Sequence, residues 1–447
     1  MTHWFHRNPL KATAPMKFDF GAQASTPLAR HMCSDIRQAR KRLLAILPDP
    51  NQDLGVLLAA TEAYFSLLHG FIEPTEGPKQ GEKKEQPPSQ QPGQDGEMLE
   101  AEDDGPSGGA SLGAGDSKLR NAVKVKWSNT LGAPPMVMRD MVFEHINMLM
   151  NVALWYSKHA AKIAGSSEEV SEVEAKEIHR CLRSAAGMFK YIEDKLLHKL
   201  FEKPGDGTDV DSRILQAYTL QCTAEAQEVT LARAISLNHT SSLISALAHE
   251  TARLFRKTSD TLKSVEESLV NKWRKYCDLK TAFYMSQAHC YNGQTLLNKD
   301  ECGKAVRALK ESDRMYEKAE LLCQEYAKTR GPGVSVRPEQ HTFFQKLRPV
   351  VKRILEKVER ENGFIYHQTV PAEVPDLEIK ATYGLASPVE YEAPTKSKEW
   401  TSEVYNGFKV STENPTEKKN EKDEPIKPVK EVPIEQTDKD QSSCVIS

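Results

Sequence analysis

The last four residues carry the most specific chemical signal in the chain. Cys444 is followed by Val445, Ile446 and Ser447, which matches a C-a-a-X prenylation box, and serine at the last position favours a farnesyl group. Protein farnesyltransferase is therefore expected to attach an S-farnesyl group to Cys444, followed by cleavage and methyl esterification of the new carboxylate. One lipid gives only marginal membrane affinity, so we expect a protein partner to supply a second attachment.

Signatures of enzymes and of metal sites are missing from the rest of the sequence. There is no G-x-x-x-x-G-K-[ST] phosphate loop and no G-x-S-x-G turn, and His249-Glu250 lacks the second histidine of a zinc-protease motif. The eight cysteines form no C-x-x-C pair, and no Cys/His set has zinc spacing. We therefore expect no catalytic residue, no metal and no cofactor, and predict that the chain is not an enzyme.

Charge is unevenly distributed along the 447 residues. The chain has 60 basic and 63 acidic side chains, a formal net charge of -3. Residues 73–117 carry a net charge of -8 and residues 411–447 one of -3, which leaves +8 for the remainder. This excess is mild and contains no dense Lys/Arg run, which argues against a nucleic-acid partner. No apolar run approaches the ~18 residues of a membrane-spanning helix, and no secretory signal is expected.

Two segments have the composition of disordered chain. Residues 73–117 contain fifteen glycines or prolines and no aromatic residue, so they cannot bury enough surface to offset the entropy of ordering. Residues 411–447 also lack aromatic residues and carry four prolines among lysines and glutamates. The predicted organisation is one domain over residues 1–410, interrupted by the acidic insert, followed by a disordered tail.

The ordered part is predicted to be mainly helical. Apolar residues recur at helical spacing over 54–72, 213–237, 241–270, 273–291 and 303–327. Ser166-Ser-Glu-Glu169 has the form of a capping box that would open a further helix. Gly293 is expected in a short connection between the last two helices. Long antiparallel helical hairpins follow, similar to tetratricopeptide units, although no clean 34-residue repeat is present.

Strand signals are few and short. Phe18 and Phe20 alternate with polar residues, and Val123-Lys-Val-Lys-Trp127 alternates strictly, so that its apolar side chains share one face. These patterns predict a small β-sheet at one end of a helical solenoid.

Three motifs follow one another in the order seen in BRO domains. They are Ser184-Ala-Ala-Gly-Met-Phe189, Ala226-Gln-Glu-Val229, and Phe364-Ile-Tyr-His367 followed by Val370-Pro371. Over about residues 10–395, without the insert, the chain resembles the BRO domain of Alix-like proteins. The resemblance implies a mainly α, boomerang-shaped helical solenoid with a tetratricopeptide-like core and a small β-sheet. The second helical domain and proline-rich tail of Alix-type proteins are not matched, so functions tied to them are not carried over.

The resemblance also implies a partner and a site. The partner is the C-terminal amphipathic helix of an ESCRT-III subunit of the charged multivesicular body protein type, bound in an apolar groove beside a basic residue. Alignment on the second motif gives these matching positions: Thr230, Leu231, Arg233, Leu243 and Leu247, with an acidic position near Glu172. Thr230 stands where the family has an aromatic residue. Partner helices dock through anchors at such helical spacing, but the same leucine spacing is equally typical of an ordinary core.

Two function classes remain open at this level. The leading hypothesis is a lipid-anchored adaptor that recruits ESCRT-III to the cytoplasmic side of endomembranes, either the endosome or the nuclear envelope and endoplasmic reticulum. The alternative is a tetratricopeptide-like scaffold for another client or for ubiquitin. Pull-down with isolated ESCRT-III tails discriminates the two.

Overall fold

The structure is a computed structural model in which part of the chain is described. The described residues are 4–17, 24–75, 115–165, 170–203, 205–333, 337, 339, 342–377, 381, 383–409 and 426–434. Cys444, the two phenylalanines of the first strand prediction and most of the predicted insert lie outside these residues.

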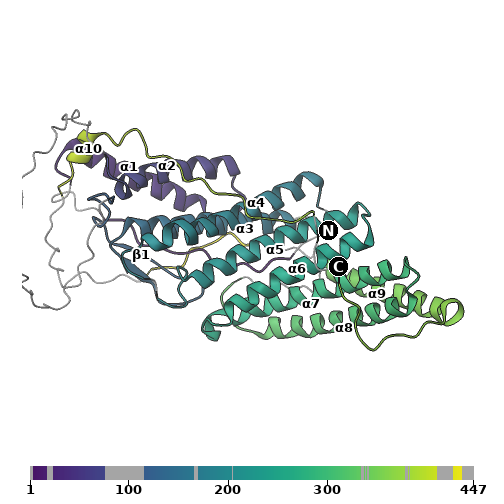
Figure 1. Ribbon diagram of the computed structural model, residues 1–447. Helices are drawn as coiled ribbons and strands as arrows, with labels where there is room; N and C mark the ends of the chain where they lie inside the picture. Colours follow the sequence, from purple (N-terminus) through teal and green to yellow (C-terminus); the bar gives the residue numbers. More distant parts are fainter. Residues whose placement is uncertain are drawn as a thin grey trace, which may run out of the picture.

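Helices make up most of the described chain. They are α1 (Pro27–Ile46), α2 (Leu54–Ile72), α3 (Met141–Gly165), α4 (Glu172–Tyr191), α5 (Ser212–Ser236), α6 (Ser241–Leu262), α7 (Glu267–Leu297), α8 (Cys302–Lys328), α9 (Thr342–Glu361) and α10 (Ser402–Asn406), with short π and 3-10 turns η1 (Ile192–Leu196), η2 (Leu197–Lys199) and η4 (Asn362–Tyr366). From α3 to α8, each helix packs against the next. Figure 1 shows the resulting elongated stack, with α1 and α2 at one end and α9 at the other.

The start of α4 differs from the prediction made from its sequence. The expected capping box at 166–169 lies outside the described residues, and the helix begins at Glu172. The cap is formed instead by Ser171, whose hydroxyl accepts from the Glu174 N–H while the Glu174 carboxylate accepts from the Ser171 N–H at 2.8 Å. The motif type was right and its position wrong, because two similar Ser/Glu patterns, at 166–169 and 171–174, follow each other within nine residues.

The helical hairpins are confirmed, with corrections to their ends. The segment predicted as one helix over 241–270 divides, since α6 ends at Leu262 and α7 begins at Glu267. Gly293 lies inside α7 rather than in a connection, and a Cβ atom there would meet Cγ of Leu309 at 2.7 Å. This glycine therefore allows α7 and α8 to approach closely.

The small sheet is a two-stranded antiparallel ribbon. Strands β1 (Val125–Trp127) and β2 (Met136–Met138) pair with Val125 opposite Met138. The predicted alternation is correct, because Val123, Val125 and Trp127 are all buried. Trp127 Nε1 donates to the Glu144 carboxylate at 2.7 Å, which fastens the ribbon to α3. The predicted mainly α fold with a small sheet is confirmed.

Helix α2 is more apolar than the sequence analysis allowed. By length and composition it could cross a membrane, contrary to the expectation that no segment approaches this limit. In this fold 10 of its 19 residues are buried, and it packs against α1 and α3. Its apolar character is therefore explained by the core of the domain.

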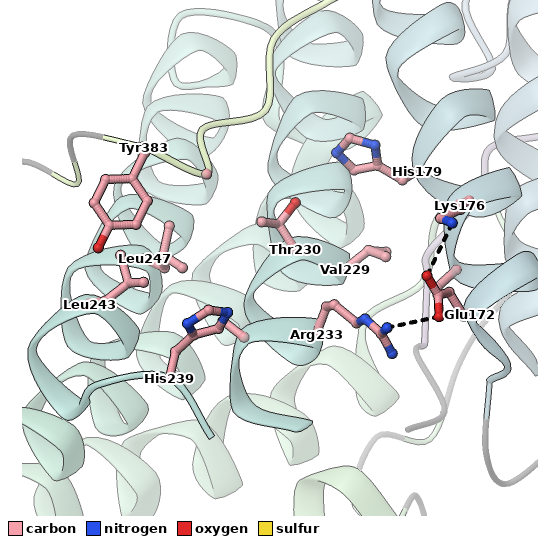
Figure 2. Close-up of a pocket in the computed structure, with 13 residues that line it drawn as sticks. Glu172, Lys176, His179, Val229, Thr230, Arg233, His239, Leu243, Leu247 and Tyr383 are labelled. Carbon is pink, nitrogen blue, oxygen red and sulfur yellow. Dashed lines mark ion pairs between the residues drawn. The ribbon is translucent and has the colours of Figure 1, made fainter. Parts of the chain in front are cut away.

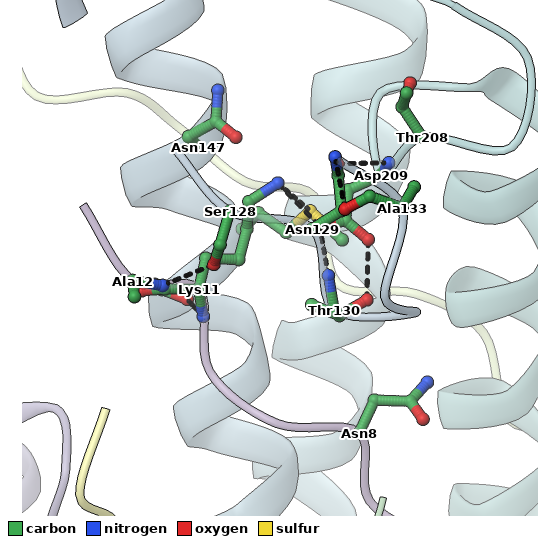
Figure 3. Close-up of polar contacts among 12 residues, drawn as sticks. Asn8, Lys11, Ala12, Ser128, Asn129, Thr130, Ala133, Asn147, Thr208 and Asp209 are labelled. Atoms are coloured by element: carbon green, nitrogen blue, oxygen red, sulfur yellow. Dashed lines mark hydrogen bonds and ion pairs between the residues drawn. The ribbon is translucent and has the colours of Figure 1, made fainter. Parts of the chain in front are cut away.

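The extended segment 4–17 is fixed in the core by buried charges. Lys11 Nζ lies 2.7 Å from the Asp209 carboxylate, and both side chains are almost fully buried. The same carboxylate accepts from the Thr130 N–H at 2.7 Å, and the Ser128 hydroxyl accepts from the Ala12 N–H at 2.8 Å (Figure 3). These bonds join the first segment, the β1–β2 region and the approach to α5, and they satisfy charges that would otherwise be costly to bury.

The ends of the predicted insert meet at the surface of the domain. The Ser117 N–H donates to the Ile72 carbonyl oxygen at 3.0 Å, where α2 ends. Deleting residues 77–113 is expected to leave the melting temperature unchanged or raise it by a few degrees, because shortening a loop lowers its closure entropy by about 1–2 kcal/mol at most. Scanning calorimetry of both proteins checks this expectation, and a fall of more than about 5 °C would show that the insert packs on the domain.

The predicted tail differs from expectation in one part. Residues 426–434 are described as extended chain in contact with the body, and the Val432 N–H donates to the Pro48 carbonyl oxygen at 2.9 Å. The prediction of a disordered tail throughout 411–447 is thus wrong for these nine residues, because they carry a paired carboxylate and partly buried apolar side chains that composition alone did not single out. The remainder of 411–447 lies outside the described residues.

Candidate partner-binding pocket

A pocket of about 310 Å³ opens between α4, α5 and α6 (Figure 2). Five of the six predicted partner-binding residues line it: Glu172, Thr230, Arg233, Leu243 and Leu247. Residues from three helices and from an extended segment near residue 384 surround the space. The structure therefore brings the residues suggested by the family alignment to one place.

Leu231 is the exception. Its side chain is 1% exposed, belongs to the hydrophobic core and does not line the pocket. Successive residues on a helix point about 100° apart, so Thr230 and Leu231 of α5 face different surroundings. Of the two, Thr230 is the one at the pocket, and the prediction that Leu231 contacts the partner is not supported by its position.

The floor of the pocket is apolar. Val229 and Leu247 are nearly buried, and Leu243 is half-buried at its edge. The Thr230 hydroxyl donates to the Ala226 carbonyl oxygen at 3.3 Å within its own helix. Because of that bond, the Thr230 hydroxyl does not need a hydrogen-bond partner from a ligand. An apolar side chain entering this space would be transferred out of water without stranding a polar group.

The rim on the α4 side carries an excess of positive charge. Arg233 and Lys176 each lie 3.0 Å from a different oxygen of the Glu172 carboxylate. Hydrogen bonding and charge from Lys176, together with the charge of Arg233, lower the pKa of Glu172. Two cations thus face one anion, and Figure 2 shows all three side chains along one edge. The site favours an acidic ligand at this edge.

Tyr383 is an aromatic residue of the pocket that the sequence pattern did not predict. Tyr383 lies beside Leu243 and Leu247 in Figure 2, and its side chain is 64% exposed. It comes from an extended segment about 150 residues after α5, which we call the strap (residues 383–391). An aromatic ring therefore borders the pocket although Thr230 occupies the family's aromatic position. Helical periodicity offers no signal for such a residue, since the strap is not helical.

Residues of two family motifs hold the strap in place. The Gln227 side chain donates to the Gly384 carbonyl oxygen at 2.9 Å and accepts from the Ala386 N–H at 2.7 Å. A Cβ atom at Gly187 would lie 1.7 Å from the carbonyl oxygen of Val389, so only glycine permits this approach. Gly384 itself has φ +74°, a conformation that favours glycine. These motif residues position Tyr383 rather than contact a ligand.

The neighbouring motif residue Glu228 anchors α5 from its other side. Both its carboxylate oxygens lie 2.8 Å from Lys280 Nζ of α7, and the two side chains are fully buried. The ammonium group also lies 3.7 Å from the centre of the Trp4 ring. In the motif Ala226-Gln-Glu-Val229, therefore, Gln227 orients the strap, Glu228 fixes the helix and Val229 lines the pocket.

Comparisons with known proteins agree with this architecture. The model of the BRO1-like domain family matches residues 112–409. The chain is 45% identical to the BRO1 domain-containing protein BROX of Xenopus tropicalis over 96% of this chain and 94% of that protein, and 45% identical to the human protein of that name over 92% of each. The zebrafish (Danio rerio) relative is 43% identical over the full length of both chains.

Solved structures share the fold at lower sequence identity. A structure described as "ALIX BRO1 CHMP4C complex" is 17% identical, with a TM-score of 0.61, and the match covers 89% of this chain and 98% of that one. A second, described as "Structure basis for endosomal targeting by the Bro1 domain", has a TM-score of 0.56 over 91% and 98% of the two chains at 18% identity. These structures show the shared fold, and the family model together with the relatives of 43–45% identity shows that the chain belongs to the BRO1-like domain family.

Proposed function

We propose that this BRO1-domain protein is an adaptor that binds the C-terminal amphipathic helix of an ESCRT-III charged multivesicular body protein subunit. The observation that carries the proposal is the pocket between α4, α5 and α6, where an apolar floor lies beneath a rim with two cations and one anion. The similar solved structure of an ALIX BRO1 domain with CHMP4C supports this class of partner.

An acidic amphipathic helix matches the pocket in both shape and charge. Its apolar residues recur at i, i+3, i+4 and i+7, a stripe that fits a groove between helices. Leu243, Leu247 and Val229 would receive this stripe, with Tyr383 against its side. Arg233 would exchange part of its pairing with Glu172 for a carboxylate on the partner. The apolar contacts supply most of the affinity, since rim charges mainly steer association.

The second half of the proposal concerns attachment to membranes. The thiol of Cys444 would carry an S-farnesyl group added by protein farnesyltransferase, followed by methylation of the new carboxylate. The lipid and the partner together would hold the adaptor on the cytoplasmic side of endomembranes, the endosome or the nuclear envelope and endoplasmic reticulum. Neither attachment is strong alone, and two weak attachments on one surface reinforce each other.

Isothermal titration of the full chain with a peptide of an ESCRT-III C-terminal helix tests the binding proposal. Saturable binding with a negative heat-capacity change is expected, because apolar surface is buried. The alternative, a scaffold for another client or for ubiquitin, is tested by the same titration with ubiquitin. Binding of ubiquitin without binding of the helix peptide would favour the scaffold alternative.

Arg233→Ala is expected to weaken binding of the acidic helix by about threefold to fivefold, because Arg233 is about half exposed and solvent screens its charge. The loss should shrink in 0.5 M salt, where the Debye length is only about 4–5 Å. Titration at two salt concentrations measures both effects. Arg256→Ala serves as a matched control, since Arg256 is exposed on α6 and does not line the pocket. An equal loss in both variants would show that Arg233 acts only through net charge.

A further inference from the structure

Residues 426–434 contact the body, and the Glu431 carboxylate in this segment has two partners there. One oxygen of Glu431 accepts from the Leu10 N–H at 2.7 Å, and the other lies 2.8 Å from Lys158 Nζ. Each oxygen thus has its own partner, and the two partners come from chain segments about 150 residues apart. Such a paired arrangement is more selective for a carboxylate than a single surface lysine would be.

Backbone and apolar contacts extend along the same segment. The Val432 N–H donates to the Pro48 carbonyl oxygen at 2.9 Å in the turn between α1 and α2. Val429 and Ile434, on either side of Glu431, pack against the hydrophobic core. Residues 426–434 are therefore held over their length rather than at one point.

On the body side, a buried ammonium group and a backbone N–H held by the core meet this carboxylate. The Lys158 side chain is 3% exposed and, within the described residues, its ion pair is the one with Glu431. Burial lowers the pKa of Lys158, while the charge of Glu431 acts in the opposite direction. Leu10 is held in place because the next residue, Lys11, exchanges two backbone hydrogen bonds with the Asn151 side chain at 2.8 and 2.9 Å. With residues 426–434 in place the ammonium group is buried, and a buried ammonium group without a counter-charge is strongly unfavourable, so the Glu431 carboxylate stabilises this arrangement.

We propose that the Leu10–Lys158 site is an internal receptor for Glu431, and that docking of residues 426–434 sets how far the lipid-bearing end of the chain reaches. Cys444 lies 35 residues beyond Lys409 but only ten residues beyond Ile434. At about 3.5 Å per extended residue, docking shortens the maximum reach from roughly 120 Å to roughly 35 Å. The consequence for reach rests on the lipidation proposed above, whereas the docking itself does not.

The docking site lies next to the pocket rather than across the molecule from it. Lys158 is in the last two turns of α3, and its neighbour His159 has Nε2 3.0 Å from the Glu177 carboxylate of α4. The first two turns of α4 carry the rim residues Glu172 and Lys176. A lipid on the short tether would therefore hold the pocket close to the membrane. Because effective concentration falls with about the −3/2 power of tether length, docking would raise it about sixfold for a membrane-bound partner.

Hydrogen exchange of the full chain carrying Cys444→Ser tests the docking without any lipid. The amides of Leu10 and Val432 are expected to be protected, and Glu431→Gln should accelerate their exchange by about tenfold or more, since a charge-assisted bond is lost. Lys430→Gln is the matched control, because Lys430 is exposed in the same segment, and it should leave both rates at the parent value. The proposal would be overturned if the Val432 amide of the parent chain exchanged as fast as it does in an unstructured peptide. Unchanged amide exchange rates in Glu431→Gln would overturn it as well.

A second variant covers the case in which an unpaired Lys158 unfolds the body. Val432→Pro removes the N–H that donates to Pro48 and leaves the ion pair intact. Its Leu10 amide should exchange faster than in the parent chain at an equal melting temperature, and an unchanged rate would count against docking as a unit. The farnesylated Glu431→Gln protein should stay bound to vesicles. Its tryptophans should lie farther from the membrane than those of the parent protein, so energy transfer to an acceptor lipid should be weaker. Failure of the parent protein itself to bind vesicles would contradict the lipid proposal and leave the exchange result standing.

Discussion

Replacing Cys444 by serine is expected to release the protein from membranes. The thioether of a prenyl group requires the cysteine sulfur, so the variant cannot be modified at this position. A single lipid chain of comparable size, such as a myristoyl group, binds membranes with an association constant on the order of 10⁴ M⁻¹. At roughly millimolar accessible lipid, the bound fraction should fall at least tenfold when the lipid is absent. Flotation of both proteins with vesicles, without an ESCRT-III partner, measures this fraction.

Two control variants separate the lipid from other effects of the tail. Ser443→Ala changes the neighbouring side chain and leaves the C-a-a-X box intact, so its flotation should match that of the parent protein. Ser447→Leu is expected to exchange farnesyl for the longer geranylgeranyl group and to retain membrane binding. Equal flotation of Cys444→Ser and the parent protein would refute the lipid proposal, because the sulfur would then be irrelevant.

Leu243→Asp is expected to weaken binding of the ESCRT-III helix by about 100-fold. Leu243 lines the pocket at the third position of α6, and its N–H donates to the capping hydroxyl of Thr240. A carboxylate placed there must lose water when the partner's apolar stripe docks, at a cost of about 3 kcal/mol. The fold should tolerate the change, because an acidic side chain in the first turn of a helix is favourable.

Leu247 is a weaker probe of the same surface. Its side chain is 2% exposed and lies against Gly384 of the strap. A charge there would unfold the core as readily as it would block a ligand. The matched control for Leu243→Asp is Leu321→Asp, because Leu321 is 60% exposed on α8 and does not line the pocket. Titration with the helix peptide compares the two, and equal affinities in folded proteins would show that this pocket is not the binding site.

The amphipathic helices and the short strand follow from local pattern. The predicted range 213–237 agrees with α5 within one residue at each end, and 54–72 agrees with α2. The alternation of Val123, Val125 and Trp127 likewise corresponds to buried positions. These elements were accessible because burial of one face leaves a repeat of 3.6 or 2 residues in the sequence itself.

Other helices lack such a pattern or carry a different signal. In α3, 22 of 25 residues are buried, so the helix is enclosed on nearly all sides and has no polar face to mark its period. The start of α1 could have been found from its cap, since Thr26 accepts from the Ala29 N–H and Pro27 follows at the first helical position. Gly293 suggested a connection because glycine usually ends helices. Here it lies inside α7, where the absence of a side chain lets Leu309 of α8 pack closely.

The sequence by itself determined the helical class, the family motifs and the C-a-a-X box, because each depends on residues close together in the chain. Only the tertiary structure showed that Tyr383 lies beside Leu243 and that the Leu231 side chain points into the core. Only the tertiary structure showed the contacts of Glu431 with Lys158 and Leu10. Each of these contacts joins segments more than 100 residues apart or depends on the rotation of one helix among its neighbours. No local repeat records such a contact, since it arises from close packing of helices and from the need to pair a buried charge.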